Sequence, residues 1–213
     1  MEFLSGFLDL VLHLDSHLQA LTAQYGAWIY AILFAVIFCE TGLVVTPFLP
    51  GDSLLFVAGT LSATGNPYVH DLFLALAAAS FLGDNTNYWI GHYLGPRLFR
   101  HENSRLLNPA HLQRTQRFYD RYGAKTVFMA RFVPIVRTFA PFVAGMGKMR
   151  YSRFLFYSFS GSIAWTGSLI YAGYYFGNVP AIRENLSLVI IAIVVISLLP
   201  GVIEYLRHRS SRK

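Results

Sequence analysis

An apolar stretch that cannot form one continuous helix places the strongest constraint on how this chain folds. The stretch runs over residues 27–61 and is broken by two prolines and a glycine within residues 47–51. Its uncharged first arm, residues 27–39, reaches only about 20 Å as a helix, short of a ~30 Å hydrocarbon core. Broken backbone at membrane depth is tolerated only where it is buried in protein or lines a water-filled cavity. This pattern predicts a re-entrant hairpin that carries Glu40 and Asp52 at its tip.

A second apolar stretch, residues 126–147, is interrupted in a similar way. It carries Arg131 and Arg137 together with Pro134 and Pro141 among otherwise apolar residues. A proline inside a helix removes a hydrogen-bond donor and clashes with the preceding turn, so a straight helix across the membrane is not expected here. We interpret this stretch as a second re-entrant hairpin.

The composition places the whole chain in the membrane class. Of its 213 residues 54% are hydrophobic and the mean hydropathy is +0.44, which predicts a single all-α integral membrane domain. Lys and Arg outnumber Asp and Glu by 17 to 11, but the surplus falls in loops between apolar segments rather than on a nucleic-acid-binding surface. No cleaved signal peptide is expected, because no basic region or small-residue cleavage site opens the chain.

Helical periodicity and charge divide this domain into segments. Residues 3–24 have one apolar side but carry two aspartates and two histidines, so we interpret them first as an interfacial amphipathic helix and second as a tilted span. Beside the two hairpins we expect about three spanning helices, over residues 72–93, 154–176 and 186–206. The predicted segments of the domain 1–213 are an amphipathic helix at 1–24, a first repeat at 26–95, a cytoplasmic loop at 96–121, a second repeat at 122–177 and a spanning helix at 186–206.

Three short matches recur in the same order in the two predicted repeats. The positive-inside rule places the basic residues of 96–125 and the basic tail after residue 206 in the cytoplasm. The first repeat then begins outside and the second inside, which predicts an inverted repeat whose hairpins meet from opposite sides, as in secondary transporters. The matches are Tyr25-Gly26-Ala27 with Tyr122-Gly123-Ala124, Phe56-Val57-Ala58-Gly59 with Phe142-Val143-Ala144-Gly145, and Gly91-His92-Tyr93-Leu94-Gly95 with Gly173-Tyr174-Tyr175-Phe176-Gly177.

The hairpins carry four ionisable residues that are costly to bury. At the bilayer centre each of Glu40, Asp52, Arg131 and Arg137 costs about 2.5–3.5 kcal/mol when unpaired. The sum, roughly 10 kcal/mol or more, is comparable with the entire stability of a protein, about 5–15 kcal/mol. These groups are therefore expected to pair or to share a hydrated cavity. Ion pairs that only hold the hairpins are the alternative, but such pairs stabilise poorly relative to apolar replacements, which favours a functional role.

The chemistry of these groups indicates proton-coupled movement of an anionic group. The guanidiniums of Arg131 and Arg137 offer permanently charged, forked donors that suit a phosphate. The carboxylates of Glu40 and Asp52 take up protons more readily in a partly desolvated site than in water, which suits proton carriers. Asp84 has two interpretations of equal weight, a third titratable group or a hydrogen-bond partner for the backbone at a helix break.

Several other residues are given structural roles. His92, Trp89 and Trp165 are interpreted as packing or interfacial residues. Small residues let helices approach closely, and this role is predicted for a set of glycines. They are Gly83, Gly91, Gly95, Gly161, Gly167, Gly173 and Gly177.

Four motifs together resemble a known family over nearly the whole chain. They are Glu40-Thr41-Gly42, Pro50-Gly51-Asp52, Gly83-Asp84-x-x-Asn87-Tyr88-x-Ile90-Gly91 and Arg131-Phe132-x-Pro134-x-x-Arg137-x-x-x-Pro141-x-x-Ala144-Gly145-x-x-x-Met149. This pattern resembles the DedA family of bacterial inner-membrane proteins, also called SNARE-associated or VTT-domain proteins. The runs 38–58 and 130–147 look close to the branch of the family that includes its namesake.

The resemblance implies a role in recycling undecaprenyl phosphate, the lipid carrier of envelope synthesis, across the bacterial inner membrane. It also implies dependence on the proton-motive force and kinship with eukaryotic lipid scramblases. Family members depend on an acidic pair and an arginine pair, which Glu40, Asp52, Arg131 and Arg137 match. The expected partners are thus an anionic polyprenyl phosphate, protons and membrane lipids, without a cofactor or nucleic acid, and a homodimer is left open.

Two other functions remain open from the residues. A proton-coupled exporter of small cations or drugs would use Glu40 and Asp52 as its substrate site, with the arginines as counter-ions. A membrane lipid phosphatase needs a nucleophilic histidine or a metal-binding carboxylate cluster. None of the seven histidines lies beside the arginine motif and no carboxylates have ligand spacing, so neither an enzyme nor a metal site is expected.

The predicted topology can be tested with reporter fusions. A reporter fused after Lys213 is expected to be cytoplasmic, because the basic tail stays inside, and one inserted near Asn66 is expected to be periplasmic. Activity of a phosphatase and of a fluorescent protein at each position measures the side. Finding both positions on one side contradicts the inverted repeat.

Overall fold

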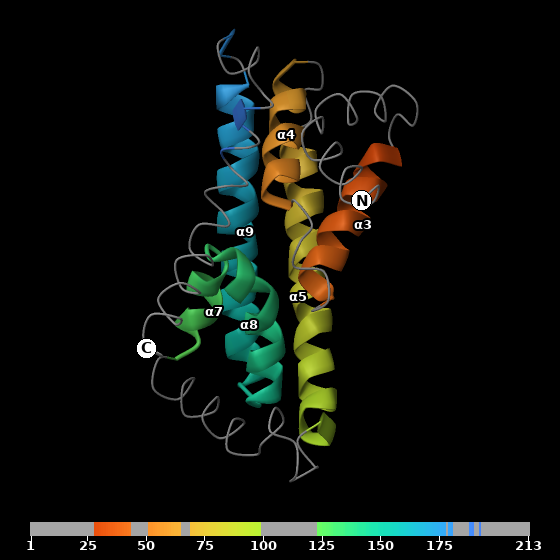
Figure 1. Cartoon of the computed structure of the whole chain (residues 1–213), viewed down its shortest axis with the longest axis vertical. Coiled ribbons are helices and arrows are strands. Elements are labelled where there is room, and N and C mark those ends of the chain that lie inside the picture. The colour runs from red at the N-terminus through yellow and green to blue at the C-terminus, as the bar shows by residue number, and fades with distance from the viewer. Residues whose placement is uncertain are drawn as a thin grey trace, which may run out of the picture. The chain divides into compact units, whose positions relative to one another are not determined.

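The computed structural model is all-helical in the residues that it describes. These are residues 28–43, 51–64, 69–98, 123–177, 179, 180, 188, 189 and 192. The elements are α3 (Trp28–Gly42), α4 (Gly51–Thr64), α5 (Val69–Leu98), α7 (Lys125–Ala130), α8 (Pro134–Met146) and α9 (Tyr151–Phe176), shown in Figure 1. The predicted amphipathic helix at 1–24, nearly all of the loop at 96–121 and most of the helix at 186–206 lie outside the described residues. Within the described helices, none is both long and apolar enough to count as a candidate membrane span.

The chain forms two compact units, and each of them is built from distant parts of the sequence. The first unit contains residues 1–36, 48–76 and 166–213, and the second contains residues 37–47 and 77–165. Three long helices, α3, α5 and α9, each contribute one part to each unit.

Both predicted interrupted stretches are broken in the structure. In the first, α3 ends at Gly42 and α4 begins at Gly51. In the second, α7 ends at Ala130 and α8 begins at Pro134, which occupies the first helical turn. The residue before Pro134, Val133, is extended (φ −118°, ψ 105°), as expected for a residue that precedes a proline. Proline chemistry therefore places a non-helical bend next to Arg131.

The end of α8 is a hydrogen-bonded reversal that leads directly into α9. Lys148 has a positive φ of 52°, and its N–H donates to the carbonyl of Gly145 at 3.0 Å. The N–H of Met149 donates to the carbonyl of Ala144, also at 3.0 Å, which completes a Schellman motif. The Met149 carbonyl in turn accepts the Tyr88 hydroxyl at 2.6 Å. This turn ties the end of α8 to α5.

Within the second unit, α8 lies beside the C-terminal part of α5 at a close approach made by two glycines (Figure 1). A Cβ atom on Gly91 would overlap the carbonyl oxygen of Phe142, and one on Gly145 would overlap that of Tyr88. Around this contact Tyr88 stacks on Phe154 with ring centroids 4.4 Å apart, in a buried core that includes Val127 and Ala144.

The first unit contains the equivalent contact between α4 and the C-terminal part of α9. A Cβ atom on Gly173 would overlap the carbonyl oxygen of Phe56, and one on Gly59 would overlap that of Ile170. The Thr60 hydroxyl donates to the Gly173 carbonyl at 3.2 Å. The Phe-Val-Ala-Gly segment of one predicted repeat therefore packs on the Gly-x-Tyr-x-Gly segment of the other repeat, once in each unit.

Substitution of Gly173 by alanine is expected to lower the melting temperature of the purified protein in detergent. The added methyl group meets backbone rather than a movable side chain, and overpacking of this kind costs about 1–3 kcal/mol. Gly167→Ala in the same helix is the control, because its methyl group meets the Phe73 ring at 3.3 Å and alanine favours a helix. Equal melting temperatures for the two variants would show that the close approach does not matter.

Candidate functional site

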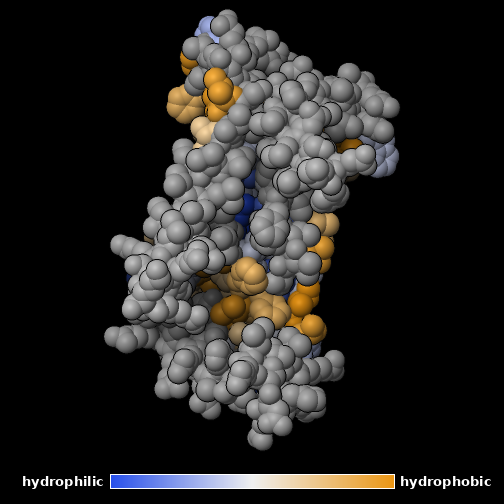
Figure 2. Space-filling view, viewed as in Figure 1, coloured by the Kyte–Doolittle hydropathy of each residue, from blue (hydrophilic) through white to orange (hydrophobic). Residues whose placement is uncertain are grey.

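The second unit has a polar interior beneath an apolar exterior. Large apolar side chains are exposed on its helices, including Leu82 on α5, Phe132 and Phe139 around α8, and Phe156 on α9. Figure 2 shows orange apolar side chains on the visible surface of the described residues. In the described part of this unit, the buried polar residues are Glu40, Thr41, Ser80, Asp84, Asn87, Arg131, Arg137, Thr138, Ser158 and Ser162. Burial of polar groups together with exposure of large apolar ones is typical of a unit surrounded by lipid.

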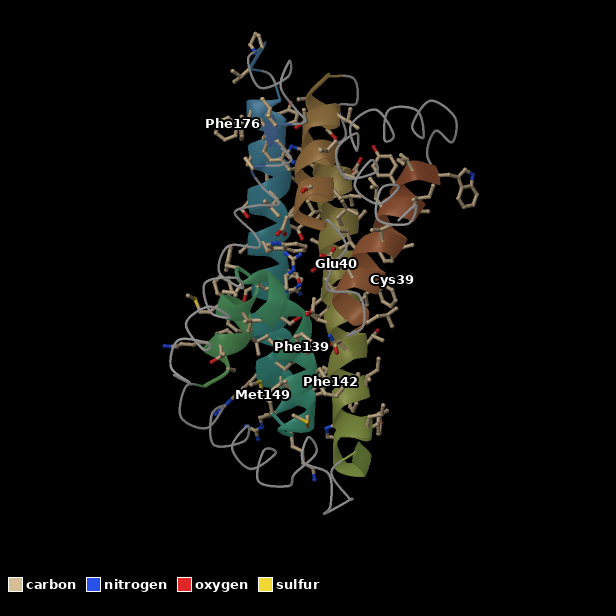
Figure 3. All side chains as sticks on the ribbon, viewed as in Figure 1. Cys39, Glu40, Phe139, Phe142, Met149 and Phe176 are labelled. Atoms are coloured by element: carbon tan, nitrogen blue, oxygen red, sulfur yellow. The ribbon has the colours of Figure 1, made fainter. Side chains whose placement is uncertain are left out.

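Among the described residues, a first buried ion pair joins the two interrupted stretches. Glu40 lies near the C-terminal end of α3 and is labelled in Figure 3. The Nη2 atom of Arg137, in the first half of α8, donates to Oε1 of Glu40 at 2.6 Å. Both side chains are almost fully buried, so this is a charge-assisted hydrogen bond with little access to water.

The second buried ion pair joins Arg131 to Asp84. Arg131 directly follows α7, and its Nη2 atom donates to Oδ2 of Asp84 in the middle of α5. The same Nη2 atom donates to Oγ of Ser162 at 2.7 Å, and the Ser158 hydroxyl donates to Asp84 Oδ2 at 2.6 Å. One carboxylate oxygen thus receives hydrogen bonds from a guanidinium and from a hydroxyl group.

One face of α9 is shaped to receive the arginines. Ser158, Gly161, Ser162 and Trp165 recur at the spacing that places them on the same side of a helix. Gly161 makes room for the stem of Arg131, whose Cγ lies 3.1 Å from where a Cβ would be. The Trp165 ring centroid lies 5.8 Å from Cζ of Arg131 and 4.6 Å from Cζ of the second arginine, in cation–π contact range. The two guanidiniums therefore converge on one indole ring.

Asn87 braces the two interrupted stretches through their backbones. Its side-chain Nδ2 donates to the carbonyl of Thr41 at 3.0 Å and to the carbonyl of Thr138 at 2.7 Å. These are the residues directly after Glu40 and Arg137, so one amide holds the backbone beside both members of the first ion pair.

The structure sorts the predicted site residues into two places. Glu40, Arg131 and Arg137 lie in the second unit together with Asp84, whereas Asp52 lies in the first turn of α4 in the first unit. The helix-break interpretation of Asp84 is not what the structure shows. Helix α5 runs unbroken from Val69 to Leu98, and Asp84 binds side chains of other segments.

Other residues of the site were not predicted. Trp165 was interpreted as a packing or interfacial residue, but it contacts both arginines. The roles of Asn87, Ser158 and Ser162 were also missed. The available signal was a polar stripe at helical spacing inside an apolar segment, the pattern on α9.

The assembled site suits an oxyanion. Its two guanidiniums lie near each other and carry donors of the type that bind phosphate or carboxylate. In the part of the chain that the structure describes, no group of three or more His, Cys, Asp or Glu side chains is placed to hold a metal ion.

Comparison with known proteins identifies similar sequences over most of the chain. The model of the VTT domain matches residues 49–175. Protein DedA of Escherichia coli (strain K12) is 51% identical over 211 residues, which cover 98% of this chain and 96% of that protein. An uncharacterized membrane protein of Mycobacterium tuberculosis (strain ATCC 25618 / H37Rv) is 41% identical over 191 residues, 89% of this chain and 84% of that protein. Inner membrane protein YqjA of E. coli K12 is 34% identical over 182 residues, 84% and 81% of the two chains. No solved structure matches.

Replacement of Asn87 by alanine is expected to destabilise the protein and to weaken the first ion pair. Two buried carbonyl groups each lose one hydrogen bond, at a cost of about 0.5–1.5 kcal/mol for each bond. The melting temperature in detergent should fall well below that of Thr86→Ala, a control whose hydroxyl donates to the Leu82 carbonyl of its own helix. A Thr86→Ala effect as large as that of Asn87→Ala would contradict the bracing role.

Proposed function

We propose that this chain, which belongs to the DedA family of VTT-domain membrane proteins, moves a polyprenyl phosphate lipid carrier across the membrane with the help of the proton-motive force. The observation that carries the proposal is the pair of buried guanidiniums, Arg131 and Arg137, held within contact of one indole ring inside a unit with an apolar exterior. Such a site can take an anionic headgroup out of water while the apolar chain of the lipid stays in the bilayer. The proposed role is transport rather than catalysis.

The proposed architecture is an inverted repeat of two re-entrant hairpins with about three spanning helices. Support comes from the equivalent glycine contacts of the two units, in which Gly91 and Gly173 meet the carbonyls of Phe142 and Phe56. The relatives are named as membrane or inner membrane proteins. We place this chain in the bacterial inner membrane as a multi-pass protein, with a cytoplasmic C-terminus as the basic tail predicts.

A phosphate is the anion that this chemistry favours. A guanidinium presents planar, paired donors, and two of them near one point match the several acceptor oxygens of a phosphate monoester. The cation–π contacts with Trp165 orient both groups without supplying a competing anion. A polyprenyl phosphate combines such a headgroup with a long apolar chain, and undecaprenyl phosphate is the member of this class that the family resemblance implies.

We assign proton coupling to Glu40 and Asp52. Glu40 is buried and bonded to Arg137, so its charge state controls whether that guanidinium is neutralised from within the protein. A carboxylate deprived of water binds a proton more readily than one in bulk solvent, which suits a group that responds to a proton gradient. Asp52 enters this proposal from the family pattern and from its place beside the break in the first hairpin.

Arg131→Lys and Arg137→Lys are expected to leave a stably inserted protein with poor lipid transport. Lysine keeps the charge but not the forked donors, and loss of one charge-assisted hydrogen bond, about 1.5–3 kcal/mol, weakens binding roughly 10- to 150-fold. The measurement is the transfer of labelled undecaprenyl phosphate across liposomes with and without a pH gradient, set beside membrane abundance. Arg153→Lys, at an exposed position in the first turn of α9, is the matched control.

The same assay tests the carboxylates. Glu40→Gln and Asp52→Asn should make transport less dependent on the gradient, since an amide cannot carry the proton. If transport follows membrane abundance for all of these variants, the four charges only support the fold and the proposed function is wrong.

A further inference from the structure

The contact between Asp84 and Arg131 uses only part of each group. Oδ2 of Asp84 accepts from Arg131 and from Ser158, whereas Oδ1 is buried without a hydrogen-bond partner among the described residues. Nη1 of Arg131 is likewise buried and unpartnered within the described part of the chain. The strongest arginine–carboxylate pairs use two parallel hydrogen bonds. This pair therefore leaves one acceptor atom, Oδ1 of Asp84, and one donor atom, Nη1 of Arg131, without a hydrogen bond within the described residues.

The two ion pairs of the site also differ in how they are supported. The pair between Glu40 and Arg137 is flanked by the backbone bonds that Asn87 makes to the next residue of each segment. The Asp84–Arg131 pair is contacted by the hydroxyls of Ser158 and Ser162, which can rotate to new partners. If Asp84 withdraws, Ser162 still holds Arg131 at 2.7 Å. Arg131 thus has a hydrogen-bond partner other than its anion.

The charge of the site limits what can enter it. Two guanidiniums and two carboxylates, those of Glu40 and Asp84, are buried together and sum to zero. A phosphate monoester brings a charge of about −1.5 to −2 near neutral pH. An uncompensated buried charge is so costly that groups change protonation instead. Entry of the headgroup therefore requires uptake of protons by the groups that face it.

We propose that Asp84 is an internal counter-anion that the lipid phosphate displaces from Arg131, and that Asp84 takes up one proton as it is displaced. The inference rests on the proposed function and names a coupling residue for it. In this exchange the Arg131–Asp84 ion pair breaks, an Arg131–phosphate ion pair forms, and one proton from solution binds the carboxylate, for which the unpartnered Oδ1 is the available atom. No electron or covalent bond to the lipid is involved.

The groups that face Asp84 from neighbouring segments make its position specific. Arg131 follows α7, Arg137 on α8 is near enough to interact electrostatically, and Glu40 on α3 bonds that second arginine. From α9 the facing groups are the uncharged hydroxyls of Ser158 and Ser162. The backbone of Asp84 belongs to the continuous helix α5, so the exchange concerns its side chain.

The fluorescence of Trp165 can be used to follow this exchange. It has three tryptophans, of which Trp28 and Trp89 are partly or largely exposed, whereas Trp165 is buried against both arginines. A Trp28→Phe, Trp89→Phe protein keeps Trp165 alone, and its fluorescence can be titrated with farnesyl phosphate in detergent between pH 6 and pH 9. The melting temperature of this background should match that of the unmodified protein.

The decisive comparison is between the Asp84→Asn variant and its parent in this background. Binding to the parent should weaken as the pH rises, because proton uptake accompanies binding. For Asp84→Asn, the increase of Kd with each pH unit should be about tenfold smaller than for the parent, because the variant takes up one proton fewer on binding. At pH 9 the variant should therefore bind farnesyl phosphate more tightly than the parent does. Titration of the ligand itself is common to both proteins and cancels in the difference.

A second variant covers the case in which Asp84→Asn does not fold. Ser158→Ala removes one donor to the carboxylate, so Asp84 should protonate more easily and binding should persist to higher pH, with affinity at pH 6 unchanged. A merely structural role would weaken binding equally at every pH.

The outcomes separate the inference from the proposed function. The role of Asp84 is wrong if Kd depends on pH equally in Asp84→Asn and its parent, or if Ser158→Ala does not change this dependence. Neither result contradicts the binding of phosphate by the site. Absence of farnesyl phosphate binding to the parent, or binding that Arg131→Lys leaves unaltered, overturns the proposed function and this inference together.

Discussion

Neutralisation of buried charge is the constraint on which the second unit depends. Three regions that are distant in sequence contribute to one compensated cluster: Glu40 from α3, Asp84 from α5, and the two arginines from the interrupted stretch of α7 and α8. Removing one member would leave its partner buried and unpaired, which is far more costly than the pair is worth. The cluster therefore ties the segments together, while the hydroxyls and amide around it determine which contacts can be exchanged.

The charged groups of the cluster lie on two kinds of backbone, a continuous helix and interrupted segments. Arg131 lies at the non-helical turn that precedes Pro134, and Arg137 lies in the first half of α8, directly after this turn. Asp84 and Asn87 lie one turn apart on the unbroken α5, and each reaches a different part of the interrupted segments. A straight helix thus presents fixed polar groups to segments whose backbone already departs from regular geometry.

The helical class, the broken stretches and the charged hairpins could be predicted because each depends on local properties of the sequence. Prolines and charges inside apolar runs are visible without knowledge of the fold. The partner of Arg131 could not be found in this way, because Asp84 lies 47 positions away and only tertiary contact distinguishes it from Asp52. Asn87 and Ser158 were missed since a neutral polar residue in a helix carries no sign of what it contacts. The glycine contacts were predictable in kind, but their pairing across the two halves was not.

That crossed pairing has a consequence for how the protein is made. Each unit needs pieces from both halves: α4 packs on α9, the last of the six described helices in chain order, and α5 packs on α8, which is synthesised after it. When a ribosome has completed only the first half, the carbonyl-lined surfaces around Gly59 and Gly91 have no helix to close against them. Neither of these contacts can therefore form until the second half of the chain has been synthesised.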